Sequence, residues 1–451
     1  MTEPSADRAR YAVELRDLLR LALPMVVAQV GMMMLGVVDT VMVGHLSEQA
    51  LAAVALGGTY SWAAMILGMG VLHGLDPLVS QAHGARDLDA ISLALQRGLV
   101  LSLVVSIPYV ILFEASAPIL VALRQPPEVV AIAAPYLESL APSVPAFFAF
   151  VALRQTLQAR GVVRPVLIAV VVGNLANYAG NLVLIYGRLG LPALGVVGSG
   201  WSTTICRYLM LAVVAWLGAP SLADVWRRPS RRLRELSPYL RMLVIGLPIG
   251  VQIGLEMWVF TAAALLIGSM GALQMSGHQI AINLASLSFM VPLGIGAAAA
   301  TRVGNAIGRN DAPGARRAAL VSVLLGASVM TVAAISFWLL PAELARIYSP
   351  DPRVVAAASE LLPIAALFQV FDGTQAVGCG ILRGAADTRS AAYINFVGYW
   401  VLGLPLGYTL AFHGGLGPRG LWWGLTLGLA VVATLVVLRI LTRFRHALTR
   451  V

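Results

Sequence analysis

The chain has 451 residues, of which 59% are apolar and 12% are charged, against roughly 25% charged residues in a typical soluble domain. A soluble core cannot cover that much apolar surface, so the composition excludes a soluble protein and predicts an all-α polytopic membrane protein. The net charge of +10 comes from 31 basic residues, all of them arginine, and most lie between apolar runs. That distribution is typical of membrane topology and not of a nucleic-acid-binding surface.

Twelve apolar runs, bounded by charged residues, Gly or Pro, predict transmembrane helices along the chain. They lie at residues 18–43, 51–75, 92–113, 129–153, 164–186, 194–217, 242–268, 277–301, 317–340, 354–382, 391–412 and 420–441. The loops on one side of the membrane carry only five arginines, which are Arg124, Arg188, Arg346, Arg353 and Arg419. Because arginine accumulates on the cytoplasmic side, both termini are predicted to be cytoplasmic, as an even number of spans also requires.

The two halves of the chain resemble each other at an offset of about 224 residues. Pro24 in "LALPMVVAQVGMM" corresponds to Pro248 in "IGLPIGVQIGLEM", and "SQAHGARD" at 80–87 corresponds to "GNAIGRND" at 304–311. Parallel repeats of this kind predict two pseudo-symmetric six-helix lobes. The predicted segments are a tail at 1–17, lobes at 18–217 and 242–441, an arginine-rich cytoplasmic linker at 218–241 and a tail at 442–451.

Three acidic residues inside the predicted spans are the candidate functional acids. They are Asp39, Glu256 and Asp372. A charge near the bilayer centre costs at least about 2.5–3.5 kcal/mol, so such residues usually face a water-filled cavity on an ion or proton pathway. Protonated acids that hold neighbouring helices together are the structural alternative.

Polar residues at helical spacing accompany these acids. Gln252 lies one turn before Glu256, and Gln279 and Asn283 share one face of the eighth span. In the first half, Asn177 and Asn181 form a stripe that we expect to face Asp39. Amide stripes also serve as contacts between membrane helices, so packing remains an alternative for them.

Two carboxylates in one pocket of low dielectric constant repel each other, and a proton, a sodium ion or an organic cation relieves that repulsion. Glu256 and Asp372 are therefore the predicted cation site. Their carboxylate oxygens are ligands that suit a hard ion such as sodium. Gln279, Asn283, Gln252 and Met257 are the predicted substrate contacts. Methionines such as Met257 would provide an adaptable apolar surface for varied drugs, although core packing explains them equally well.

Three segments carry a resemblance to a known family. "PMVVAQVGMMMLGVVDTVMVGHL", "GHQIAINLASLSFMVPLGIGAAAATRVGNAIG" and "FDGTQAVGCGILRGAADTRS" resemble the multidrug and toxic compound extrusion (MATE) family, especially its NorM-like branch. The resemblance implies a V-shaped pair of six-helix lobes that exports cationic, often aromatic compounds in exchange for sodium or protons. It also implies that Asp39, with Asn177 and Asn181, forms a cation-binding site in the first lobe, and that Glu256 and Asp372 form the cation site of the second.

The predicted function is thus a multidrug antiporter of the inner or plasma membrane, monomeric, with no enzymatic activity and no cofactor beyond the coupling ion, Na⁺ or H⁺. Its partners would be small organic cations and the lipid bilayer, with no nucleic acid. A lipid-linked saccharide flippase of the same superfamily is one alternative. However, its cavity should carry several arginines, whereas Arg207 is the one arginine predicted deep within a span. A membrane-embedded enzyme that uses paired acids is the other alternative, although the sequence contains no recognised catalytic or P-loop motif.

Overall fold

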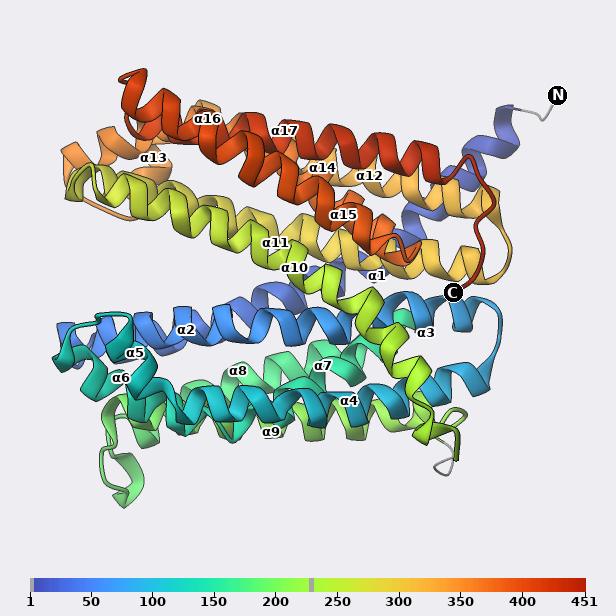
Figure 1. Cartoon of the computed structure of the whole chain (residues 1–451), viewed down its shortest axis with the longest axis horizontal. Coiled ribbons are helices and arrows are strands. Elements are labelled where there is room, and N and C mark those ends of the chain that lie inside the picture. Colours follow the sequence, from blue (N-terminus) through green and yellow to red (C-terminus); the bar gives the residue numbers. More distant parts are fainter. Residues whose placement is uncertain (1–3, 227–230) are drawn as a thin grey trace. The chain divides into compact units, whose positions relative to one another are not determined.

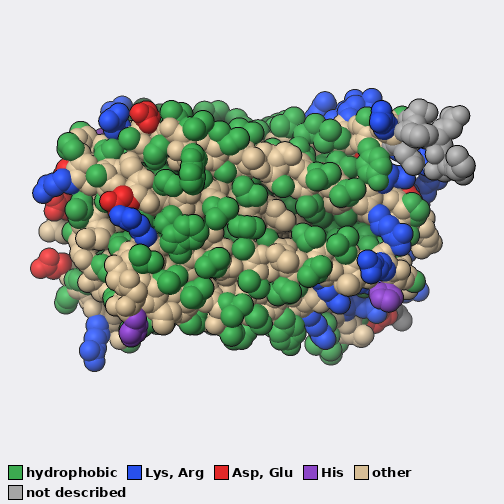
Figure 2. Space-filling view, turned by 90° about the horizontal axis from the view of Figure 1, so that it is seen from above, with side chains coloured by type: hydrophobic (Ala, Val, Ile, Leu, Met, Phe, Trp, Pro, Cys, Tyr) green, Lys and Arg blue, Asp and Glu red, His purple; other side chains and the backbone are tan. Residues whose placement is uncertain are grey.

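The computed structural model describes residues 4–226 and 231–451, and this part of the chain consists of helices and turns without a strand. Eleven helices are long and apolar enough to cross a membrane, or up to twelve if one bent pair counts as a single span. The all-α membrane fold predicted from composition is therefore confirmed. Figure 2 shows a surface covered largely by hydrophobic side chains, with charged ones gathered near the helix ends.

The chain divides into two compact units, which are described separately (Figure 1). The N-terminal unit comprises residues Val27–Gly250, and the C-terminal unit comprises Met1–Val26 together with Val251–Val451. The helices that lie wholly in the N-terminal unit are α2 (Glu48–His73), α3 (Leu75–Gly84), α4 (Leu88–Glu114), α5 (Ser116–Ala122), α6 (Pro127–Leu140), α7 (Ser143–Ala159), α8 (Arg164–Leu184) and α9 (Gly195–Leu222), with the short turns η1 (Arg188–Gly190) and η2 (Arg231–Arg234). The predicted lobe boundaries at 18–217 and 242–441 stay a prediction.

The C-terminal unit is built around α14, which packs against α11, α12 and α17. The elements that lie wholly in this unit are α11 (Ala272–Gly308), α12 (Ala312–Leu339), α13 (Pro341–Arg346), α14 (Pro352–Gly384), α15 (Thr388–Asn395), η3 (Phe396–Gly403), α16 (Leu404–Tyr408), η4 (Thr409–His413) and α17 (Pro418–Arg443). Together α15, η3, α16 and η4 form one candidate membrane span, Thr388–His413.

Two long helices, α1 (Pro4–Gly44) and α10 (Leu236–Gly268), are each divided between the units. Residues up to Val26 of α1 belong to the C-terminal unit, and α10 up to Gly250 belongs to the N-terminal unit. The two division points, Val26 and Gly250, are separated by the same number of residues as the two halves of the repeat. Pro24 and Pro248 precede them by two residues, and a proline inside a helix removes one backbone hydrogen bond. Each half of the chain thus contributes the first part of its first helix to the other unit.

The repeat is also visible in two turns that have the same backbone geometry. After α3, Arg86 adopts a φ of 57° and Asp87 caps α4 by accepting a hydrogen bond from the Ala90 amide at 3.0 Å. After α11, Asn310 adopts a φ of 58° and Asp311 caps α12 through the Gly314 amide at 2.8 Å. A positive φ is uncommon outside glycine, so its recurrence at this offset supports a repeat in the structure as well as in the sequence.

Helices α11 and α14 approach closely because glycines face each other along their contact. A Cβ on Gly380 would overlap the backbone of Gly296, and one on Gly384 would overlap that of Ala300. Small residues allow membrane helices to pack backbone to backbone, which is a main source of their association in lipid. This contact holds α14, the helix that carries Asp372, against α11.

Two predicted segments differ from the structure in detail. The predicted span at 129–153 is instead the pair α6 and α7, bent by 51° after Leu140, where Pro142 precedes the first residue of α7. The predicted linker at 218–241 begins inside α9 and ends inside α10, and residues 227–230 lie outside the described residues. Arg160 binds both oxygens of Asp224 in this linker, at 2.9 and 2.7 Å, and this pairing lowers the pKa of Asp224.

Candidate functional site

Glu256 on α10 and Asp372 on α14 both lie in the C-terminal unit. Asp372 is 3% exposed, whereas Glu256 is only partly buried. The two carboxylates are close enough to interact electrostatically. Among the described residues, no donor makes a hydrogen bond to Asp372 and no arginine forms an ion pair with either acid. The site therefore holds two acidic groups that the described part of the protein does not neutralise.

Amide side chains of α14 and α15 form a hydrogen-bonded chain that reaches Glu256. The Gln375 side-chain nitrogen, one turn from Asp372 on α14, donates to Glu256 Oε2 at 3.3 Å and to Asn395 Oδ1 at 3.0 Å. Asn395, at the end of α15, also donates to the thiol of Cys379 at 3.6 Å. Earlier on α14, Gln369 donates to Ser288 of α11. The side-chain amide oxygens (Oε1) of Gln369 and Gln375 are buried and accept no hydrogen bond from a described residue.

Tyr399 brings a phenol hydroxyl to the same cluster. Its side chain is fully buried, it interacts electrostatically with Glu256, Asp372 and Cys379, and its hydroxyl has no hydrogen-bond partner among the described residues. Tyr399 lies in η3, a π-helical stretch, and such stretches are frequent at functional sites because they redirect side chains. The next residue, Trp400, fixes η3 against α10 by donating to the Leu255 carbonyl at 3.0 Å, directly beside Glu256.

The N-terminal unit holds a different acidic site around Asp39. Asn177 and Asn181 of α8 donate to Asp39 Oδ1 at 3.0 and 2.6 Å, and Thr203 of α9 donates to Oδ2 at 2.7 Å. The asparagine stripe thus faces Asp39 as expected, and both asparagines are fully buried. These hydrogen bonds favour the ionised carboxylate, whereas burial opposes it. Asp39 is therefore solvated by the protein itself, unlike Asp372.

Arg207 also lies in the N-terminal unit, where it supports the bend between α6 and α7. Its guanidinium donates to Ser143 Oγ at 2.7 Å and stacks over the ring of Phe147 at 4.8 Å. Ser143 is the first residue of α7, and its own hydroxyl donates to the Leu140 carbonyl at 2.6 Å. These contacts give Arg207 a structural role at the broken span.

The four predicted substrate residues lie on α10 and α11 of the C-terminal unit. On α10, Gln252 is buried and Met257 is exposed. On α11, Gln279 is exposed, and the Asn283 amide donates to the Gln279 carbonyl of its own helix at 2.8 Å. Within the described residues, none of the four makes a hydrogen bond to Glu256 or Asp372. Their role as substrate contacts stays a prediction.

No group of three or more His, Cys, Asp or Glu side chains that could hold a metal ion occurs within residues 4–226 and 231–451. What the C-terminal unit does offer is a pair of carboxylates with amide and phenol oxygens near them. Oxygen ligands of this kind suit hard cations, and the same carboxylates can take up protons.

Sequence reasoning missed Thr203, Tyr399 and Asn395. Thr203 had a signal, because Ser199, Thr203 and Arg207 form a polar stripe at four-residue spacing on an otherwise apolar helix. Tyr399 had no signal in the sequence, because the direction of its side chain depends on the π-helical stretch η3. The repeat offset did not help either, since the two acidic sites are not equivalent in the repeat.

Many candidate membrane spans, together with buried acids in both units, are typical of a multi-pass membrane transporter. The family model described as MatE matches residues 24–183 and again 248–409, so this chain belongs to the MatE family. The two matched segments begin at Pro24 and Pro248, the same pair that marks the repeat.

Relatives agree with this assignment. The chain is 36% identical to the multidrug resistance protein MdtK of Pectobacterium atrosepticum over 439 residues, which is 96% of each chain. It is 38% identical to the probable multidrug resistance protein NorM of Bradyrhizobium diazoefficiens over 440 residues, covering 95% of this chain and 93% of that one. The resemblance to the MATE family and its NorM-like branch is confirmed.

Solved structures show the same fold. The eukaryotic MATE transporter AtDTX14 matches with a TM-score of 0.88 at 24% identity, covering 97% of this chain and 98% of that one. The Vibrio cholerae MATE transporter VcmN, in its bent form, matches with a TM-score of 0.85 at 17% identity, covering 96% and 98%.

Proposed function

We propose that this transporter exports cationic and aromatic drugs across the inner membrane in exchange for sodium ions or protons. The observation that carries the proposal is the pair formed by Glu256 and Asp372, two acids in one cluster with no ion-pair partner among the described residues. The names of its relatives MdtK and NorM, both multidrug resistance proteins, support the substrate class.

The exchange follows from the charge of the pair. When both acids are ionised they repel each other, and one positive guest, either the coupling cation or the drug, relieves that repulsion. Binding of the coupling cation then weakens the hold on a cationic drug. The membrane potential contributes roughly 2.3 kcal/mol per elementary charge per 100 mV, so entry of one coupling ion can drive appreciable drug accumulation outside.

The difference in exposure between Glu256 and Asp372 supports different roles for the two acids in cation binding. Glu256 is partly accessible and Asp372 is buried, so a cation would reach Glu256 first and then be shared with Asp372. The Tyr399 hydroxyl and the Gln375 side-chain oxygen, which have no hydrogen-bond partner among the described residues, would supply further oxygen ligands. Asp39, with Asn177 and Asn181, would form a second polar site in the N-terminal unit, where a cation must compete with three donors already in place.

The drug would lie against the exposed part of α10 and α11. Met257 and Trp258 are exposed next to Glu256, and Gln279 and Asn283 add polar groups on one face of α11. A flexible thioether and an indole ring adapt to varied apolar shapes. With both termini in the cytoplasm, as the arginine distribution indicates, export would run from the cytoplasmic side outward.

The test is drug efflux from cells that lack other exporters and express Glu256→Gln or Asp372→Asn. Both changes keep the side-chain shape and remove the charge. We expect efflux of a cationic dye to fall at least about tenfold, because the loss of a charge-assisted contact to the cation costs that much in binding. The matched control is Glu360→Gln, an exposed acid on α14 whose ion pair with Arg419 is solvent-accessible. Wild-type efflux in both site variants, at equal protein levels, would refute the proposal.

A further inference from the structure

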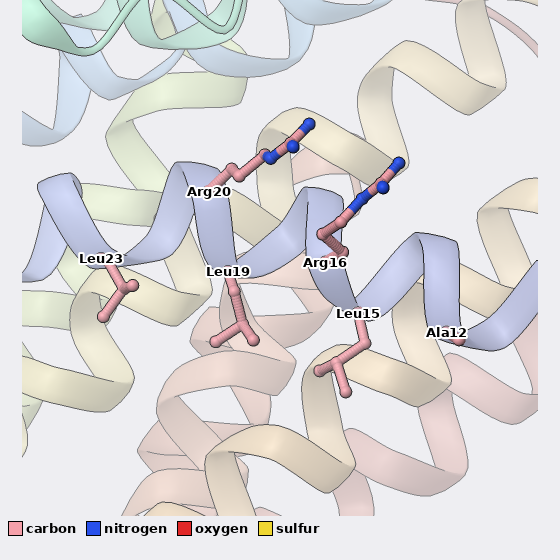
Figure 3. A pocket seen from close by; sticks show the side chains of 6 residues that line it. All are labelled: Ala12, Leu15, Arg16, Leu19, Arg20 and Leu23. Atoms are coloured by element: carbon pink, nitrogen blue, oxygen red, sulfur yellow. The ribbon is translucent and has the colours of Figure 1, made fainter.

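The N-terminal part of α1 carries a shallow groove that the proposed transport function does not use. It has a volume of about 350 Å³ and lies in the C-terminal unit. Its lining residues are Ala12, Leu15, Arg16, Leu19, Arg20 and Leu23 (Figure 3). The groove therefore combines an apolar stripe with two cationic side chains on a single helix.

The helical period places the two kinds of residue on adjacent faces. Leu15, Leu19 and Leu23 follow one another at four-residue spacing along the axis, and Arg16 and Arg20 occupy the neighbouring edge. In Figure 3 the guanidinium groups of Arg16 and Arg20 extend in the same direction from the helix, and the leucine side chains leave it in a different direction. Leu23 is 62% exposed, so the apolar stripe is open to its surroundings.

The acidic residues of this helical segment are engaged elsewhere. Arg302 of α11 binds both oxygens of Glu14, at 2.8 and 2.7 Å, and lies 3.5 Å from Asp17. Arg16 and Arg20 are both exposed, and no acidic side chain among those described pairs with them. Two like charges four residues apart on a helix repel each other, so an anion held between them is stabilising.

We propose that this groove binds one anionic phospholipid, with its phosphate between Arg16 and Arg20 and its acyl chains over Leu19 and Leu23. Arginine matches phosphate oxygens with two parallel hydrogen bonds. The long apolar run of α1 begins directly after Arg20, which places the two guanidinium groups at the level of the lipid headgroups. The leucine stripe favours a lipid over free phosphate, because a soluble anion would make no use of it.

The test uses the purified full-length protein in detergent, with bound lipids counted by native mass spectrometry during titration with dioleoylphosphatidylglycerol or dioleoylphosphatidylcholine. We expect tighter binding of the anionic lipid. The double variant Arg16→Gln/Arg20→Gln should weaken that binding by about 30-fold and leave the zwitterionic lipid nearly unchanged. The charge-matched control is Arg309→Gln/Arg445→Gln, two exposed arginines of the same unit, which should cause no such loss.

Equal weakening by both double variants, or equal affinity for the two lipids in the wild type, would overturn the proposal. A second variant, Leu19→Ala/Leu23→Ala, separates lipid from free phosphate because it keeps both arginines. We expect it to weaken binding of the anionic lipid several-fold. Unchanged lipid binding in this variant, together with displacement of the lipid by inorganic phosphate, would mean that the arginines bind phosphate alone. Unaltered thermal unfolding of each variant confirms that the fold is intact.

Discussion

Asp39 and Asp372 are both buried acids, but their surroundings differ. Three side chains donate hydrogen bonds to Asp39, and no described residue donates to Asp372. A buried charge without donors is costly, and a proton or a cation removes that cost. At the level of single residues, the two acids therefore differ in their hydrogen bonding: a cation at Asp39 has to compete with three donors, and one at Asp372 does not.

Tyr399 provides the sharpest residue-level prediction. If its hydroxyl is a cation ligand, Tyr399→Phe should raise the concentration of coupling cation needed for half-maximal transport by about tenfold, since a hydrogen bond or contact to a charged group is worth about 1.5–3 kcal/mol. Stability should not fall, because the change removes a buried hydroxyl that has no described partner. Cation-dependent dye efflux in proteoliposomes measures the first effect, and thermal unfolding measures the second.

Tyr408→Phe is the matched control for this prediction, because Tyr408 lies in the same membrane span and is exposed. An unchanged cation dependence in Tyr399→Phe would remove Tyr399 from the site. A large loss of stability would instead assign its hydroxyl a structural role.

How far the sequence predicted these residues depends on how rare each residue type is in a membrane helix. Asp39, Glu256 and Asp372 were found because a charge in an apolar helix is conspicuous, and the asparagines were found because amide spacing follows the helical period. Tyr399 is a common type of membrane residue, so only its three-dimensional neighbours identify it, whereas Thr203 lies in the polar stripe that it forms with Ser199 and Arg207. The cation and drug roles of all these residues remain predictions.

At the level of elements, the contact between α11 and α14 decides whether Asp372 is held in place. Gly380→Ala should destabilise the protein by about 1–3 kcal/mol, because the added methyl group overlaps the backbone of Gly296. Gly36→Ala is the control, since Gly36 lies inside α1 with no atom within 4 Å of an added Cβ. There the higher helix propensity of alanine should leave stability unchanged or raise it.

Thermal unfolding in detergent compares the two glycine variants directly. A lower unfolding temperature for Gly380→Ala alone would support tight backbone packing of α11 on α14. Equal unfolding temperatures would show that the two helices can move apart at little cost, and Asp372 would then not be rigidly positioned.

The elements themselves were largely predictable from apolar runs, because a spanning helix needs a fixed length of apolar sequence. The bend between α6 and α7 was not, although Pro135, Pro142 and Pro145 lie close to it. Prolines are tolerated inside many membrane helices, as Pro24 and Pro248 are here, so their presence does not say which helix breaks. The π-helical stretch η3 likewise has no clear sequence signal.

At the level of the whole molecule, the repeat accounts for the exchange of helical segments between the two units. The same family model matches both halves, and the units divide at Val26 and Gly250, which lie at equivalent positions of the repeat. The offset in the sequence predicted the repetition but not this exchange, because periodicity carries no information on which unit a helix packs against. The orientation of the termini rests on the arginine distribution and stays a prediction.

The central claim is that a cation bound at Glu256 and Asp372 is exchanged for the drug. The most direct test places the full-length protein in liposomes loaded with a cationic dye and imposes a sodium gradient or a proton gradient, each alone. We predict that at least one gradient drives the dye against its own concentration, and that the same gradient has no effect in Asp372→Asn. Failure of both gradients with correctly folded wild-type protein, or equal transport by Asp372→Asn, would contradict the claim.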